Sequence, residues 1–140
     1  MLLDRILHTY TIIFVFLGII LIPQIFPLLS EYEGKILPVV STLEIFDETT
    51  CSTRNCVEFN VKIKKKRQCE FLGINWYSSK HRRLQLIFEP ELPNTPKSRP
   101  TGLQIAGPWI LYGVDSLKDT YALVAHRCHP FWVTYTNLYP

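Results

Sequence analysis

The chain has 140 residues, a formal net charge of +3 at neutral pH, and 47% hydrophobic residues. This length is enough for one small domain beside a membrane anchor, but not for two domains. The modest net charge does not mark the whole chain as a binder of polyanions such as nucleic acid.

The first predicted element is a membrane-spanning helix over residues 6–29, an apolar run that contains no Asp, Glu, Lys or Arg. About 20 helical residues are enough to cross the hydrocarbon core of a bilayer. A cleaved signal peptide is disfavoured because bulky residues occupy the positions where a cleavage site needs small ones. The third alternative is a buried helix of a soluble domain. We expect an uncleaved anchor at 1–30 and a domain at 31–140.

The orientation of this anchor is predicted from the charges that flank it. Arg5 and the α-amino group oppose Asp4 before the apolar run, whereas Glu31 and Glu33 precede Lys35 after it. Positive charge favours the cytoplasmic side. We therefore expect a single-pass inner-membrane protein with a cytoplasmic N-terminus and a periplasmic or otherwise extracytoplasmic domain. Two prolines, Pro23 and Pro27, are expected to kink or end the helix.

The rest of the chain is predicted to be all-β. Val57, Phe59, Val61 and Ile63 alternate with polar residues, which is typical of a strand with one buried face. A proline-rich stretch at 89–102 is expected to be a surface loop. Six or seven short strands without an amphipathic helix favour a small antiparallel β-sandwich, immunoglobulin-like in architecture. The strands are expected at 35–46, 57–64, 69–77, 84–88, 103–112 with a break or bulge at Gly107-Pro108, 121–125 and 131–136.

Four cysteines can form two disulfides in an oxidising compartment. Cys51 and Cys56 would bridge a hairpin tip. Cys69 and Cys128 would then pair at a separation of 59 residues, which is close to that of the immunoglobulin inter-sheet bridge. However, Trp76 follows Cys69 too soon to be the immunoglobulin core tryptophan. The pattern thus supports the architecture and not immunoglobulin ancestry.

The net charge is unevenly distributed, because a basic run lies in the middle of the chain. Such a run on a rigid strand could contact an acidic protein face or anionic lipid headgroups. An exposed tryptophan could add an apolar contact. The alternative is an ordinary solvated sheet face. Nucleic acid is not expected, because the aromatic residues are not interleaved with the basic ones. The candidate contact residues are Lys62, Lys64, Lys65, Lys66, Arg67 and Trp109.

The densest group of potential metal ligands is His126, Cys128 and His129. Histidine and cysteine side chains in an extracytoplasmic β-domain are compatible with copper or zinc. A disulfide at Cys128 would remove the thiolate, and the only methionine is Met1. We therefore expect a structural turn with partly exposed histidines, and keep the metal or redox site as the alternative.

No hydrolase, zinc-protease or phosphate-binding motif occurs in the sequence. A cysteine nucleophile at Cys128, beside His126 or His129, is conceivable, but the even number of cysteines favours a disulfide. We therefore expect neither an enzyme nor a cofactor.

Three stretches, at residues 65–73 (KKRQCEFLG), 99–109 (RPTGLQIAGPW) and 126–132 (HRCHPFW), resemble a group of small uncharacterised single-pass membrane proteins of bacteria and their phages. The resemblance implies one N-terminal span and a short β-rich domain, without an activity or a cofactor.

These features together predict a non-catalytic membrane protein whose β-sandwich is an interaction or accessory module, such as a small subunit of a larger membrane assembly. The alternative is a periplasmic metal-binding or redox module. The expected partners are the lipid bilayer and another membrane protein or assembly.

Overall fold

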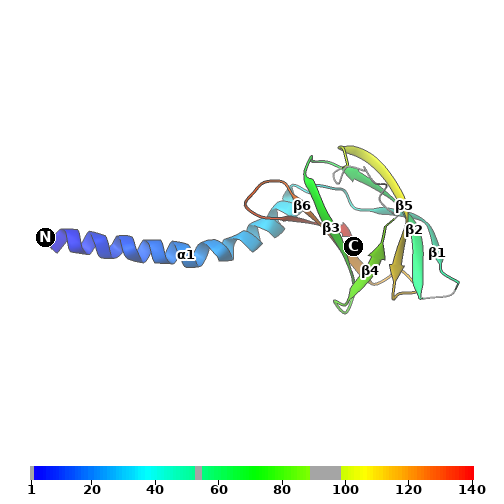
Figure 1. Cartoon of the computed structure of the whole chain (residues 1–140), viewed down its shortest axis with the longest axis horizontal. Helices are drawn as coiled ribbons and strands as arrows, with labels where there is room; N and C mark the ends of the chain where they lie inside the picture. Colours follow the sequence, from blue (N-terminus) through cyan, green and yellow to red (C-terminus); the bar gives the residue numbers. More distant parts are fainter. Residues whose placement is uncertain (1, 53–54, 89–98) are drawn as a thin grey trace.

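The computed structural model describes residues 2–52, 55–88 and 99–140, with side chains from residue 5 onward. Helix α1 (Leu2–Ile36) continues through Pro23 and Pro27, and its axis bends part-way along its length (Figure 1). Of the two outcomes expected at the prolines, the structure shows a bent helix and no helix end at Pro23 or Pro27. A proline costs one helical hydrogen bond and commonly bends a helix without ending it.

The helix is long and apolar enough over Arg5–Ile36 to cross a membrane. Its apolar side chains over residues 6–29 do not pack into the domain core, and most of them are exposed. An apolar helix that is exposed on every side is typical of a segment that lipid surrounds.

Seven antiparallel strands form one sheet that curves into a half-barrel (Figure 1). Their order across the sheet is β1-β2-β5-β4-β3-β6-β7. This confirms an all-β domain behind an N-terminal helix. It does not support two stacked sheets of immunoglobulin type, because β4 pairs with both β3 and β5 and joins the two halves. The strands are β1 (Glu44–Thr50), β2 (Cys56–Lys65), β3 (Glu70–Ser78), β4 (Arg83–Ile87), β5 (Gly102–Tyr112), β6 (Thr120–Arg127) and β7 (Thr134–Tyr139).

The core of the half-barrel combines many aliphatic side chains with a few large aromatic ones. Phe59 of β2 and Trp76 of β3 are fully buried, and their ring centroids lie 5.5 Å apart. These two strands are not neighbours in the sheet, so only its curvature lets their side chains meet. The indole N–H of Trp76 donates a 2.9 Å hydrogen bond to the Thr120 hydroxyl, which satisfies its one buried polar atom.

The segment 37–43 differs from the strand that the sequence predicts over 35–46, since α1 extends to Ile36 and β1 begins at Glu44. The segment lies between β2 and β7 and bonds to both. The Ser41 amide donates to the Lys64 carbonyl of β2 at 2.9 Å, and the Leu43 amide donates to the Leu138 carbonyl of β7 at 2.7 Å. The polypeptide that leaves the helix therefore links the two sides of the half-barrel.

The remaining strand predictions are confirmed with shifted ends. Strand β5 is one strand with a register shift against β2, as the Gly107-Pro108 break predicts. Strand β7 begins three residues later than expected, because residues 128–133 form the turn that precedes it. Most of the proline-rich stretch, residues 89–98, lies outside the described residues.

Both predicted disulfides are formed, with Cα–Cα distances of 5.4 Å for Cys51–Cys56 and 4.6 Å for Cys69–Cys128. Each continues an antiparallel ladder by one pair, because Thr50 is opposite Val57 and Glu70 is opposite Arg127. Cys69–Cys128 thus joins neighbouring strands of the same sheet and is not an immunoglobulin inter-sheet bridge. The similar sequence separation arises because β3 and β6 are sheet neighbours with β4 and β5 between them in sequence.

We predict that the two disulfides contribute unequally to stability. The double variant C69S/C128S should lose about 4 kcal/mol of unfolding free energy, and C51S/C56S about 2 kcal/mol, because the longer loop restricts the unfolded chain more. Urea unfolding of the full chain in detergent measures both values, and equal losses would contradict the loop-length argument.

Candidate functional site

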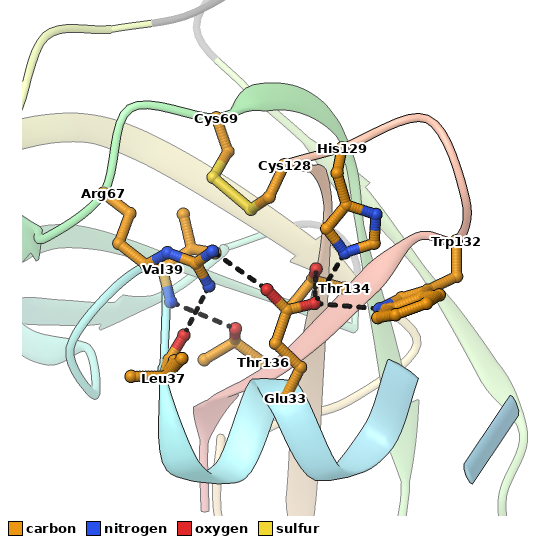
Figure 2. A network of polar contacts seen from close by, with 10 residues as sticks. All are labelled: Glu33, Leu37, Val39, Arg67, Cys69, Cys128, His129, Trp132, Thr134 and Thr136. Atoms are coloured by element: carbon orange, nitrogen blue, oxygen red, sulfur yellow. Dashed lines mark hydrogen bonds and ion pairs between the residues drawn. A yellow bond between two sulfur atoms is a disulfide. The ribbon is translucent and has the colours of Figure 1, made fainter. Parts of the chain in front are cut away.

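The most structured polar site is the junction between the end of α1 and the half-barrel, centred on Glu33 (Figure 2). One carboxylate oxygen accepts hydrogen bonds from Thr134 Oγ1 at 2.7 Å and Trp132 Nε1 at 2.9 Å, and lies 3.1 Å from His129 Nε2. The other oxygen forms an ion pair with Arg67 at 2.9 Å. We call these five residues the Glu33 network.

The members of the Glu33 network come from separate parts of the chain. Glu33 lies in the last turns of α1, and Arg67 in the connection from β2 to β3. His129 and Trp132 belong to the β6–β7 turn, and Thr134 begins β7. The Cys69–Cys128 disulfide holds the Arg67 and His129 segments together beside the carboxylate (Figure 2). The disulfide therefore positions donors that are far apart in the sequence.

The Glu33 network favours one helix position over others. The Glu33 side chain is only 13% exposed, so its charge loses most of its hydration when the junction forms. Hydrogen bonds to an ionised group are stronger than neutral ones, and they offset this loss only while all the donors are in place. The carboxylate therefore resists any movement of α1 away from the barrel.

Close backbone packing reinforces the junction. Ser30 is buried and its hydroxyl donates to the Val133 carbonyl. A side chain at Gly34 would overlap the carbonyl oxygen of Tyr135 in β7, so only glycine permits this approach of helix to strand. Arg67 also donates to the Leu37 carbonyl at 2.9 Å, which holds the first residue after the helix. The helix thus ends directly on the barrel wall.

An open groove of about 820 Å³ lies beside the junction, between the end of α1, the segment 37–43 and strands β6 and β7. Glu31 and Lys35 line it and pair with each other at 2.7 Å. The described lining residues include neither cysteine nor histidine, and Glu31 is their one carboxylate. The groove therefore offers the Glu31–Lys35 ion pair, several hydroxyl side chains and the Asn137 amide as docking groups.

The structure divides the predicted basic contact run between surface and interior. Lys64 and Lys66 are exposed, and the half-exposed Lys62 pairs with Glu44 at 3.2 Å. Lys65 is buried, and its ammonium group donates to the carbonyls of Cys69 at 3.0 Å and Arg99 at 2.7 Å. Burial lowers the pKa of this lysine.

Two further predicted contact residues are also engaged within the chain. The guanidinium of Arg67 belongs to the Glu33 network. Trp109 is 7% exposed and packs against Phe59 and Phe88, so it is a core residue and not the exposed contact that the sequence predicts. The strand pleat explains the burial of Lys65 and Trp109, because only alternate residues of β2 and β5 face water.

The predicted histidine turn is also different in the structure. His126 lies on β6, is 2% exposed and packs against Phe71, so it is not a partly exposed turn residue. Burial, with a further effect from the charge of Lys65, lowers the pKa of His126 to about 4. Cys128 is bonded to Cys69 and His129 contacts Glu33. The described residues contain no group of three or more His, Cys, Asp or Glu side chains placed to hold a metal ion, so the geometry does not support the metal alternative.

Comparisons with family models, curated proteins and solved structures give no match to this chain. Its function is therefore inferred from the junction itself. Sequence reasoning did not identify Glu33 as part of a site, because the anchor was expected to end at residue 30 and a strand was expected from residue 35. The available signal was the helix-forming segment 30–36, whose Glu31 and Lys35 have the spacing of a helical ion pair.

We predict that E33Q will destabilise the domain by about 2 to 3 kcal/mol, because the neutral amide replaces the charged acceptor beside Arg67. The control is E31Q, which removes an exposed charge two residues away and should leave stability unchanged. Denaturant unfolding in detergent measures both variants, and equal effects would show that the Glu33 network does not stabilise the junction.

A second prediction concerns the close approach of α1 to β7. G34A should destabilise the junction by about 1 to 3 kcal/mol, because the new methyl group meets rigid backbone. G18A is the matched control, since no atom lies within 4 Å of a side chain placed at Gly18. Hydrogen exchange of the β7 amides should rise in G34A alone. Unchanged exchange would mean that the helix does not rest on β7.

Proposed function

We propose that this chain is a non-catalytic single-pass membrane protein whose half-barrel is an interaction or accessory module, such as a small subunit of a larger membrane assembly. The observation that carries the proposal is the junction. The apolar helix runs without interruption into the Glu33 network, so the domain is attached rigidly and not by a flexible tether. Rigid presentation reduces the entropy lost when a partner binds.

The proposed location is the inner membrane, with the N-terminus in the cytoplasm and residues 31–140 on the periplasmic side. Two disulfides support an oxidising compartment. The weak charge asymmetry around the helix favours the same orientation. With this location, the chain would belong with the small single-pass membrane proteins of bacteria and their phages that its sequence resembles.

We predict that protease added to intact spheroplasts will remove the domain, because the proposed orientation exposes it outside the cytoplasmic membrane. Immunoblotting for a protected N-terminal fragment measures whether the domain has been removed. Digestion of the domain only after lysis would show the opposite orientation and would not bear on the fold.

The proposed partner contact uses the exposed members of the basic run, Lys64 and Lys66. The variant K64E/K66E should recover less of the membrane partner, and the loss should be greater at low salt, because exposed charges act mainly through long-range attraction. Stability should not change. The control K80E/K118E makes the same charge change at two other exposed lysines.

Co-purification in mild detergent at two salt concentrations, followed by quantitative mass spectrometry, measures partner recovery for the two variants. Equal recovery would assign Lys64 and Lys66 to an ordinary solvated face. The absence of any partner above the background of an unrelated single-pass protein would contradict the proposed function.

A further inference from the structure

The turn that joins β6 to β7, residues 128–133, projects alongside the helix, back toward its N-terminus (Figure 1). We call it the aromatic loop. The ring of Trp132 lies 5.9 Å from that of Phe26 in α1, and Phe131 lies 6.3 Å from Trp132. Phe131 is 70% exposed, although it is one of the larger apolar side chains of the domain.

The contact with Phe26 fixes the depth of the aromatic loop relative to the apolar run. Phe26 lies three residues before Leu29, where that run ends, which corresponds to about 4 to 5 Å along a helix. If α1 spans a bilayer, Trp132 lies level with the last turn of the span. That level is the membrane–water interface, where tryptophan and other aromatic side chains are enriched.

We propose that the aromatic loop is a second membrane contact, with Phe131 inserted among the lipids at the edge of the hydrocarbon core. This inference rests on the proposed membrane-spanning role of α1. The loop sequence, Cys-His-Pro-Phe-Trp-Val, contains no Asp, Glu, Lys or Arg whose charge would oppose insertion. Insertion would remove from water an apolar side chain that the fold leaves exposed.

The aromatic loop is held in shape for this contact. Its first residue, Cys128, is bonded to Cys69. The Trp132 indole N–H donates a hydrogen bond to Glu33, so this N–H needs no partner from the lipid. Pro130 has no amide N–H that needs a partner. A loop with these constraints loses little conformational freedom on insertion.

Another exposed apolar pair, Leu103 and Ile105 on β5, does not support a lipid contact. Their register partners on β2 are Lys64 and Lys62, so charged side chains lie directly beside them. No described contact joins this pair to α1. Of these two exposed apolar surfaces, the aromatic loop is the one that a described contact joins to the helix.

The test introduces tryptophan at Phe131 in the full chain, reconstituted in phosphatidylcholine vesicles. Lipids brominated near the upper end of the acyl chain quench tryptophan that reaches the hydrocarbon edge. The F131W variant should lose more emission in brominated than in ordinary vesicles, relative to the wild-type protein. The control is F46W, another exposed phenylalanine on β1, the strand drawn far from the helix in Figure 1. Emission of F46W should be lost no more than that of the wild type.

Alkaline carbonate extraction of the same vesicles tests the helix separately. A protein that resists extraction but shows equal quenching of F131W and F46W would overturn the aromatic-loop proposal and leave the span intact. A protein released by carbonate would overturn the span itself. Either membrane orientation gives the same quenching, so the result does not depend on topology.

Discussion

The carboxylate of Glu33 is the interaction on which the arrangement of helix and barrel depends. A charge so little exposed needs all of its donors, and those donors belong to three segments of the barrel. The pairing of β6 with β3 and with β7, together with the Cys69–Cys128 disulfide, holds these segments beside one another. The Glu33 network therefore forms as a consequence of the barrel fold, and then selects one position of the helix against it.

The disulfides act within the same arrangement by fixing ladder ends. Cys69–Cys128 closes the β3–β6 ladder at the end that faces the helix, next to Arg67 and His129. Cys51–Cys56 closes the β1–β2 hairpin. The half-barrel has two edge strands, β1 and β7, and the segment 37–43 links their sides. The packing of the core side chains favours the curved sheet. The disulfides and the backbone hydrogen bonds of segment 37–43 add further links at its ends and edges.

The sequence predicted the local elements well because periodicity and turn residues are local signals. The alternation in β2, the bulge at Gly107-Pro108 and the Cys51–Cys56 pair were recognised from neighbouring residues, and Cys69–Cys128 then followed as the remaining pair. The curvature of the whole sheet was not predicted. It arises because β4 pairs with β3 on one side and with β5 on the other, and such pairings leave no local signal in the sequence. The burial of Lys65 was missed for the same reason. Its ammonium group is satisfied by the carbonyls of Cys69 and Arg99, and the second of these lies 34 residues away.

The junction also determines how freely the domain can move relative to its helix. A helix that ends in a flexible linker leaves the domain free to tilt and rotate above the membrane. Here the Glu33 network removes that freedom between helix and barrel, and a lipid contact at Phe131 would also limit the tilt of the domain relative to the bilayer. If α1 spans a bilayer and both constraints hold, the surface around Lys64 and Lys66 would have a set tilt relative to the membrane. A partner in the same membrane would then reach that surface through lateral diffusion and rotation about the membrane normal, without a search over the tilt of the domain.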